Sequence, residues 1–261
     1  MIRRMAPSLG LTMIMLLAIS SVFVADGSDS PDHDKGVTKK YALIYNGPVS
    51  AADCPEAAAA IAESAGLKVR FLSDPGDLPR LLDEAAVFII GGTEDELYPL
   101  LKAFTPKVTT ALNDYLRKGG RYLGICGGGF LASTGWNEGA THMKGLGIIP
   151  AESSVFQDSF DAQILPVRWS GKTRPMFFKA GPDFRLAPSR ETVHIVATYS
   201  DGSIAALMCS YGKGRVAVCG PHPEARRSWI DEVAGGGAWI PSVDLAIAFL
   251  RTLLSDTPFS R

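Results

Sequence analysis

The chain has 261 residues, of which 46% are hydrophobic and 20% are charged, and its formal net charge is −1. This composition is typical of a folded globular protein and argues against a disordered or fibrous chain. A near-neutral chain without a stripe of Lys and Arg has no electrostatic basis for binding nucleic acid, so we expect no nucleic-acid partner.

The N-terminal segment has the pattern of a targeting sequence. Arg3 and Arg4 precede an uncharged stretch from Met5 to Ala25 with a strongly apolar centre. Such a pattern is typical of a secretory signal, and the stretch is also about long enough to span a bilayer, which takes roughly 20 apolar residues. We therefore expect residues 1–25 to be a cleaved signal peptide or an N-terminal membrane anchor. Either one predicts an exported protein, periplasmic or extracellular.

Residues 26–39 are polar and acidic without apolar periodicity, which predicts a linker. From Tyr41 onward, short apolar runs alternate with helical stretches. The expected strands of this part are 41–45, 67–72, 86–90 and 121–125, and the expected helices are 53–66, 78–84 and 106–118. This alternation predicts a parallel sheet covered on both faces.

The pattern changes after residue 160, where β-like runs follow one another across Gly, Pro and Asp turns. The expected strands there are 162–168, 192–199, 203–209 and 214–219, followed by a helix over 243–254. Successive strands joined by turns predict an antiparallel extension of the sheet. Residues 40–256 are thus expected to form one α/β domain whose central sheet is mostly parallel.

The run Gly124-Ile125-Cys126-Gly127-Gly128 lies where the strand 121–125 ends and a helix begins. Glycine on either side of a nucleophile lets the backbone turn sharply, which pushes the side chain outward and leaves the next N–H free. The start of a helix also favours the thiolate, which is the reactive form of cysteine. We predict that Cys126 is an exposed nucleophile.

A base for this nucleophile is expected directly after the strand 214–219, where His222 and Glu224 occur. Residues two apart in an extended segment point to the same side, so Glu224 is expected to orient His222 toward the sulfur. His194 lies in an apolar strand and is predicted to be a core residue. His142, in a Gly-rich loop after the nucleophile helix, is a distant second candidate for the base.

Ligands of open α/β sheets bind outside the carboxyl ends of the strands, where three loops of this chain are expected to meet. These loops are Asn46-Gly47-Pro48, Gly91-Gly92-Thr93 and the turn at Cys126. The N–H of Gly92 or Gly91, with that of Gly127, is predicted to form an oxyanion hole. Asn46, Gly47 and Phe130 are candidate substrate-binding residues. Trp136, Asn137 and Glu138 are candidates for shaping the substrate pocket.

These separated motifs resemble the class I glutamine amidotransferase superfamily over essentially all of residues 40–256. Within it, the opening Tyr45-Asn46-Gly47-Pro48 and the run Cys-Gly-Gly-Gly-Phe from Cys126 are most similar to the biotin-protein ligase N-terminal-like family. The resemblance implies a flavodoxin-like three-layer sandwich. It also implies a catalytic triad of Cys126, His222 and Glu224.

The chain departs from that superfamily in ways that bear on its substrate. Glutamine-hydrolysing members usually carry a Gln four residues after the nucleophile, where this chain has Phe130. No synthase domain follows to receive ammonia, so glutaminase activity is not expected. The intracellular-protease branch places a His directly after its cysteine, where this chain has Gly127. Biotin-ligase activity is not implied, because the resemblance concerns the non-catalytic N-terminal region.

The sequence therefore predicts an exported cysteine-dependent amidase or acyl-transfer hydrolase with a small-molecule or peptide amide as its substrate. A non-catalytic binding or regulatory module with the amidotransferase fold is the alternative, and a thiol sensor is a third possibility. Cys and His are too scattered for a zinc site, and no loop has phosphate-cradling spacing, so we expect no metal and no cofactor.

The remaining cysteines are expected to be structural. Four cysteines are too few for a disulfide scaffold in a chain of this length. Cys209 and Cys219 flank a predicted hairpin turn without lying opposite each other, so a disulfide between them is not expected. Cys54, close to the Asn46 loop, is predicted to be a half-buried small residue.

Overall fold

The computed structural model describes residues 41–157, 159–231, 233 and 239–259, all of which fall within one compact unit. The expected signal or anchor at 1–25 and the expected linker at 26–39 lie outside the described residues. In the part of the chain that is described, no helix is long and apolar enough to cross a bilayer.

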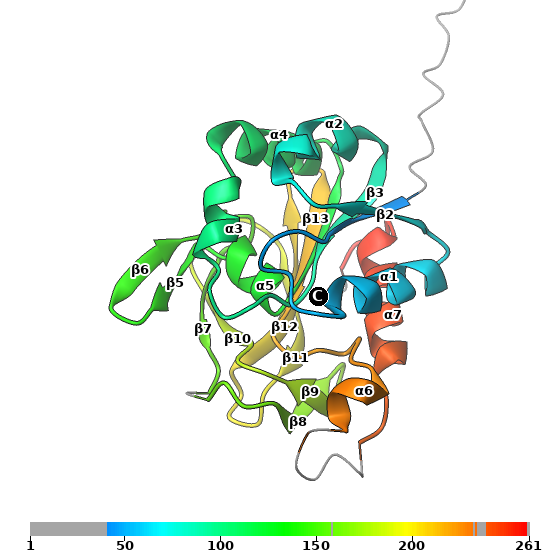
Figure 1. The fold of residues 1–261 in the computed structure, drawn as a ribbon, viewed down its shortest axis with the longest axis vertical. Helices are drawn as coiled ribbons and strands as arrows, with labels where there is room; N and C mark the ends of the chain where they lie inside the picture. Colours follow the sequence, from blue (N-terminus) through cyan, green and yellow to red (C-terminus); the bar gives the residue numbers. More distant parts are fainter. Residues whose placement is uncertain (1–40, 158, 232, 234–238, 260–261) are drawn as a thin grey trace, which may run out of the picture. The chain divides into compact units, whose positions relative to one another are not determined.

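Five strands form the parallel half of the sheet: β1 (Tyr41–Tyr45), β2 (Lys68–Leu72), β3 (Ala85–Ile90), β4 (Arg121–Ile125) and β13 (Gly214–Cys219). They pair in the order β2-β1-β3-β4-β13, and every pair is parallel. This is the flavodoxin-like strand order, which places the ligand site at the carboxyl ends of the strands (Figure 1).

Helices cover both faces of this half, with α1 and α7 on one face and α2 and α4 on the other (Figure 1). Their bounds are α1 (Cys54–Ser64), α2 (Leu78–Leu81), α4 (Pro106–Arg117) and α7 (Val243–Leu254). Alternate strand residues enter opposite cores: Ala42 and Ile44 pack on the α1 side, and Leu43 and Tyr45 pack on the α2 side. A strand apolar on both sides requires this double cover, as the sequence predicted.

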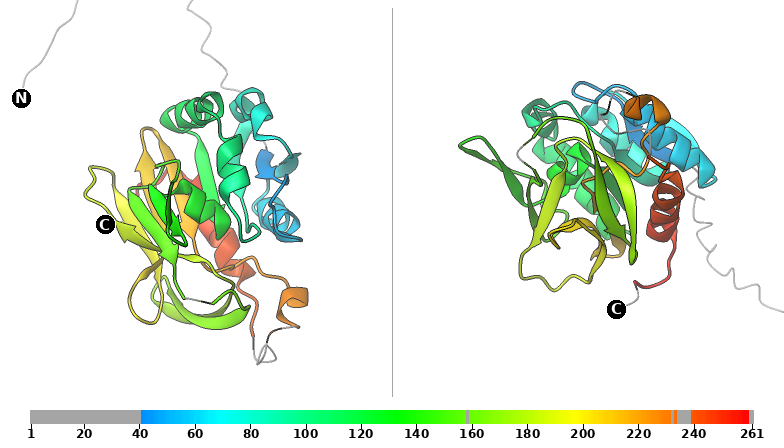
Figure 2. Two further views of the ribbon diagram at one scale, coloured as in Figure 1. Left: turned by 60° about the vertical axis from the view of Figure 1, so that its left-hand side comes forward. Right: turned by 90° about the horizontal axis from the view of Figure 1, so that it is seen from below.

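The antiparallel half continues from β13 through β12, β11 and β8 to β9 at the edge, while β10 joins β12 to β7. Its strands are β7 (Ala151–Val155), β8 (Gln163–Trp169), β9 (Lys172–Phe178), β10 (Pro182–Leu186), β11 (Val193–Thr198) and β12 (Ile204–Tyr211). Figure 2 shows these green-to-yellow strands gathered on one side of the domain, away from the blue α1. The α/β class and the antiparallel extension are thus confirmed.

Several elements were not predicted. They are α3 (Tyr98–Ala103), α6 (Arg227–Ile230), the hairpin β5 (Gly135–Glu138) and β6 (Thr141–Lys144), and the strands β7, β9 and β10. The helix predicted to begin at Cys126 is present as α5 (Gly127–Ala132), which has only 6 residues. His142 lies in β6 and not in a loop. His194 is half-buried in β11, where its ring stacks on Phe259, so the prediction of a core residue was only partly right.

Candidate active site

The turn that carries Cys126 joins β4 to α5 with a backbone conformation that few non-glycine residues adopt. Cys126 has φ 51° and ψ −107°. A Cβ on Gly124 would come within 2.4 Å of the Gly128 carbonyl oxygen, and one on Gly128 within 2.2 Å of the Ile90 carbonyl oxygen. Glycine is therefore needed on both sides of the cysteine, and the predicted sharp turn is confirmed.

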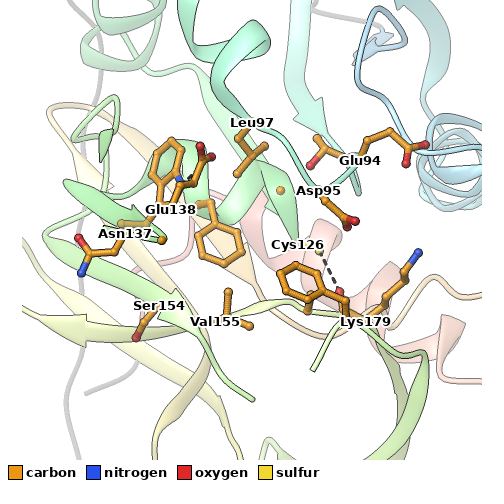
Figure 3. Close-up of a pocket in the computed structure, with 16 residues that line it drawn as sticks. Glu94, Asp95, Leu97, Cys126, Asn137, Glu138, Ser154, Val155 and Lys179 are labelled. Atoms are coloured by element: carbon orange, nitrogen blue, oxygen red, sulfur yellow. Dashed lines mark hydrogen bonds between the residues drawn. The ribbon is translucent and has the colours of Figure 1, made fainter. Parts of the chain in front are cut away.

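The Cys126 side chain is less accessible than the sequence predicted. It is only 8% exposed, because the segment after β9 lies over it. Its thiol donates a weak hydrogen bond to the carbonyl oxygen of Lys179 at 3.7 Å (Figure 3), and its N–H donates to the carbonyl oxygen of Cys219 at 2.8 Å. Cys126 thus meets solvent only through the cavities that it lines.

His222 and Glu224 lie beside this cysteine, both buried. Nδ1 of His222 is 2.8 Å from Oε1 of Glu224, and a hydrogen bond joins the His222 ring to the Cys126 side chain. Because Glu224 occupies Nδ1, Nε2 is the ring nitrogen left for the sulfur. The sequence predicted this grouping from an extended segment, which is wrong: Pro223 and Glu224 form a turn closed by Ala225 N–H on the His222 carbonyl oxygen.

The antiparallel half fixes the position of the histidine. The His222 N–H donates to the carbonyl oxygen of Phe177, the penultimate residue of β9, at 2.9 Å. The rings of Phe177 and Trp229 both meet the imidazole edge-on, each with centroids 5.7 Å away. The same strand end therefore holds His222 through Phe177 and covers Cys126 through Lys179.

The charges around His222 favour its protonated form. Burial by itself lowers the pKa of the imidazole, but negative charge on Glu224 and on the Cys126 sulfur once it has lost its proton, with the hydrogen bonds to both, outweighs burial and raises the pKa to about 10. Glu224 has a second oxygen, Oε2, that is buried without a hydrogen-bond partner among the described residues. This carboxylate faces no described cation other than His222, so its charge acts mainly on the imidazole.

The two glycines predicted as oxyanion donors, Gly127 and Gly92, line different cavities beside Cys126. Gly127 lines a cavity beside Cys126, and its N–H makes no hydrogen bond to any described residue. The N–H of Gly92 instead contacts the sulfur of Cys54, and Gly91 accepts a hydrogen bond from the Gly128 N–H. The contacts therefore favour Gly127 over Gly92 as an oxyanion donor, while the assignment of Gly91, which lines neither cavity, stays a prediction.

The direction of these amides follows from a short bridge between Thr93 and Ser50. Ala51 N–H donates to the Gly92 carbonyl oxygen, and Glu94 N–H donates to the carbonyl oxygen of Val49. Amide directions alternate along an extended chain, so the Thr93 N–H points away from Ser50 and has no described partner. A Cβ on Gly127 would lie 2.0 Å from Thr93 Oγ1, so Thr93 is the residue next to the Gly127 amide.

Cys126 lies in the wall between two cavities. The first cavity has a volume of about 440 Å³ and the second about 730 Å³. Residues shared by both are Thr93, Glu94, Asp95, Cys126, Phe160 and Lys179. Figure 3 shows Asn137 and Ser154 at one end of the first cavity, with Cys126 and Lys179 at the other.

Some of the candidate substrate-binding residues line these cavities and others do not. Phe130 lines the first cavity with its ring 6.1 Å from that of Trp136, and the predicted pocket residues Asn137 and Glu138 line it as well. Asn46 and Gly47 line neither cavity.

The Asn46-Gly47 loop has a structural place instead. Asn46 N–H donates to the Leu72 carbonyl oxygen, and Gly47 N–H donates to Ser50 Oγ at 3.2 Å. A Cβ on Gly47 would come within 2.2 Å of the Ser73 carbonyl oxygen, so this turn requires glycine for packing. The loop thus holds the segment that pairs with Thr93, one step back from the cavities.

Several cavity residues were missed by the sequence reasoning. Thr93, Glu94 and Asp95 had a signal, since they directly follow the Gly91-Gly92 strand end. Phe160, Lys179 and Trp229 had none, because they belong to loops of the antiparallel half and of α6 that no motif marks.

Cys54 is closer to the site than expected. It is 6% exposed, and a Cβ on Gly92 would lie 2.7 Å from its sulfur and 2.9 Å from Cε1 of His222. Burial, followed by the charges of Glu224 and Cys126, raises the pKa of the Cys54 thiol far above its usual range. Cys54 is therefore an un-ionised thiol, buried and not half-buried as predicted.

The other cysteines are unpaired, and the described residues include no metal-binding group. All four cysteines are free, and Cys209 lies opposite Val216 in the hairpin, so Cys209 and Cys219 do not face each other. Within the described ranges, no group of three or more His, Cys, Asp or Glu side chains is arranged to hold a metal ion.

Comparisons with known proteins agree with this architecture. Residues 81–147, which include Cys126, match the family model described as "Biotin-protein ligase, N terminal". A solved glutamine amidotransferase is 15% identical over 80% of this chain and 98% of its own, with a TM-score of 0.54. A glutamine amidotransferase from Thermotoga maritima is 19% identical over 83% of this chain and 96% of its own, with a TM-score of 0.52.

A cytoplasmic protein from Salmonella typhimurium is also similar, at 13% identity over 81% of this chain and 99% of its own, with a TM-score of 0.50. A comparison with curated protein sequences gives no significant match. At these identities the solved structures show the fold alone. The chain has a glutamine amidotransferase-like fold with a segment like the biotin-protein ligase N terminus, as the sequence predicted.

Proposed function

We propose that this protein is a cysteine-dependent amidase or related acyl-transfer hydrolase. The observation that carries the proposal is the unbroken series of contacts from Cys126 through His222 to Glu224, at a wall between two cavities. A nucleophile, a base within hydrogen-bond reach and a group that orients the base are the parts that nucleophilic catalysis requires.

The first half of the reaction forms a thioester. The Cys126 sulfur, having given its proton to His222, attacks the carbonyl carbon of the amide. The resulting oxyanion accepts hydrogen bonds from the N–H groups of Gly127 and Thr93. The C–N bond then breaks, and His222 gives its proton to the departing nitrogen while Glu224 holds the ring in place.

The second half hydrolyses the thioester. His222, now neutral, takes a proton from a water molecule that attacks the same carbonyl carbon. The C–S bond breaks, the carboxylic acid leaves, and Cys126 recovers its thiol. The raised pKa of His222 favours the proton-loaded imidazole that the first half needs for the leaving nitrogen.

Glutamine is a poor candidate for the substrate. The wall of the first cavity next to Cys126 is formed by Phe130 and Trp136, both almost fully buried. Charged side chains (Glu94, Asp95, Glu138 and Lys179) also line this cavity, but a substrate group placed against the two rings gains from being apolar, and the charged end of glutamine is not. The acyl group is therefore expected to be apolar.

A non-catalytic binding module is the second candidate. The observation in its favour is that the Cys126 thiol is 8% exposed and already contacts the carbonyl oxygen of Lys179. A binding module keeps its ligand affinity when Cys126 is replaced by Ala, whereas a hydrolase loses turnover.

We also propose export, on the basis of Arg3, Arg4 and the uncharged stretch up to Ala25. Fusion of residues 1–39 to a reporter that is active only outside the cytosol tests this. Reporter activity is expected, and its loss is expected when an Asp pair replaces two leucines of the apolar centre. An inactive reporter in the unmodified fusion contradicts export.

The chemistry is tested by competitive labelling of the native protein with a chloroacetamide electrophile, followed by peptide mass spectrometry. We expect Cys126 to be alkylated first and Cys54 to react at least about tenfold more slowly, because burial and neighbouring charge keep the Cys54 thiol protonated. Equal labelling of the two cysteines would overturn the proposal. Addition of excess phenylacetamide as a competing amide is expected to protect Cys126 only.

A further inference from the structure

The two cavities that meet at Cys126 differ in size, lining and charge. We infer that the substrate is an N-substituted amide, with an apolar acyl group in the first cavity and a positively charged amine portion in the second. This inference rests on the proposed function, because it assigns the two sides of the bond that Cys126 and His222 break.

The positions of the catalytic groups fix which side is which. His222 lines only the second cavity, whereas Gly127 lines only the first. The leaving nitrogen must receive its proton from His222, so the amine portion departs on the side of the second cavity. The acyl group then extends past Gly127 toward Phe130, whose ring lies in the first cavity.

The size of the second cavity argues for a substituted amine. A primary amide releases ammonia, which needs almost no space, whereas this cavity measures about 730 Å³. Cavities of roughly 300–1,000 Å³ are typical of sites for drug-sized ligands. The rings of Phe177 and Trp229 also lie here, 5.6 Å apart, and each meets His222. An amine that carries a carbon chain has apolar surface to place against them.

The charges of the second cavity give the sign of that amine portion. Its lining holds the exposed carboxylates of Asp53, Glu94, Asp95 and Asp161. Lys179 is the one Lys or Arg side chain in this lining, and none of the four carboxylates forms an ion pair with a described residue. A cavity lined by excess negative charge attracts a cationic ligand, and the Trp229 ring offers a face for cation–π contact.

The first cavity shares the charged wall beside Cys126 but becomes more apolar beyond it. Phe130, Trp136, Leu97 and Val155 contribute apolar surface to it. Its volume of about 440 Å³ accommodates an aromatic or branched acyl group. Glu94, Asp95 and Lys179 are shared by both cavities, so the difference in charge lies in Asp53 and Asp161 of the second cavity against Glu138 of the first, whose carboxylate accepts a hydrogen bond from Trp136 Nε1.

The test compares four phenylacetyl compounds on the full chain: the p-nitrophenyl ester, the primary amide, the N-butyl amide and the N-aminobutyl amide. We expect kcat/KM for the N-butyl amide to exceed that for the primary amide by about tenfold or more. The N-aminobutyl amide is expected to exceed the N-butyl amide by a further factor of about three to ten, with the gain shrinking as salt is added.

Two variants separate the effect of charge from the effect of apolar contact. In each variant, the quantity compared is the ratio of kcat/KM for two substrates measured on the same protein. Asp161→Asn is expected to lower the ratio of kcat/KM for the N-aminobutyl amide to kcat/KM for the N-butyl amide, because it removes one carboxylate from the rim of the second cavity. Trp229→Ala is expected to lower the ratio of kcat/KM for the N-butyl amide to kcat/KM for the primary amide. Unchanged ratios in both variants contradict the assignment of the second cavity, whatever their effect on folding yield.

The ester distinguishes failure of this inference from failure of the proposed function. If the p-nitrophenyl ester does not acylate Cys126, the hydrolase proposal itself is wrong. If the ester acylates Cys126 but the primary amide reacts as fast as the substituted amides, the cysteine chemistry stands and the inference about the amine portion is overturned. Equal rates for the butyl and aminobutyl amides overturn the assignment of charge.

Discussion

The parallel half of the domain and its antiparallel half contribute different things to one site. The parallel strands end in the nucleophile turn, in the Gly91-Gly92-Thr93 segment and, after β13, in the turn with His222 and Glu224. The antiparallel half contributes β9, whose end binds His222 by a backbone hydrogen bond and covers Cys126. The groups that we propose make and break bonds come from the first half, and β9 of the second half positions His222 and covers Cys126.

The two halves differ in how strictly they constrain the residue types at the site. Cys126 is held at a positive φ by glycines that pack against the parallel strands, and such strain persists only where the surroundings fix it. Phe177 and Lys179 act through backbone carbonyl groups, which many side chains would permit. Changes in the parallel half are therefore expected to be far more damaging than changes in the antiparallel half.

The largest effect is expected for the nucleophile. Cys126→Ala is expected to lower phenylacetyl ester hydrolysis by about a thousandfold or more, because the other thiol of the second cavity, Cys54, is held protonated by its burial. Cys209→Ala is the matched control: it removes a buried cysteine from the core on the α2 side. Comparable losses in the two variants, measured as kcat/KM, would contradict a special role for Cys126.

Glu224→Gln is expected to lower kcat/KM by about a hundredfold, since the neutral amide orients His222 but no longer stabilises its positive charge. The same change affects stability. In the folded protein the pKa of His222 is raised from 6.5 to about 10, so its stabilising contribution is complete below about pH 6.5 and is lost as pH rises toward 10.

Urea unfolding measured across this pH range checks the sign. The native protein binds more protons than the unfolded chain between these two pKa values, so the free energy of unfolding is expected to fall as pH rises. Glu224→Gln is expected to flatten that slope. A wild-type free energy that rises with pH over this window would show that His222 is not held protonated.

The contact between Gly127 and Thr93 predicts an intermediate effect. A Cβ at position 127 would lie 2.0 Å from Thr93 Oγ1 and 2.7 Å from Thr93 Cβ, so Gly127→Ala must displace the Thr93 segment. We expect a loss of roughly tenfold to a hundredfold in kcat, as for an impaired oxyanion hole. Thr93→Gly removes the clashing atoms and is expected to restore part of the activity in the double variant, and additive losses would exclude this coupling.

The smallest effect is expected at Phe130, which shapes the first cavity without touching the proton path. Phe130→Leu is expected to lower kcat/KM for p-nitrophenyl phenylacetate about threefold to tenfold relative to kcat/KM for p-nitrophenyl acetate. A ratio that stays constant would indicate that the acyl group lies elsewhere.

Much of the parallel half could be predicted from the sequence, because its central strands are buried on both faces and so appear as continuous apolar runs. The run 86–90 and the strand at 121–125 belong to this class, and the Cys126 turn follows from the glycines beside it. The grouping of Cys126, His222 and Glu224 was also predicted, although the local geometry of residues 222–224 was not.

The antiparallel half was harder to predict. β9 begins with the polar residues Lys172, Thr173 and Arg174 and contains Pro175, so it lacks a clear strand pattern. The oxyanion role that we propose for Thr93 in place of Gly92 depends on a bridge to Ser50, across a sequence separation that no local pattern encodes. Long-range backbone pairing of this kind becomes visible only in the folded domain.

Pre-steady-state hydrolysis of p-nitrophenyl phenylacetate by the native protein tests the proposed chemistry most directly. A thioester mechanism predicts a rapid release of about one p-nitrophenol per protein, with the phenylacetyl group on Cys126 by peptide mass spectrometry. Release without a burst, or an adduct found on a lysine and not on Cys126, would contradict the proposal that Cys126 is the nucleophile.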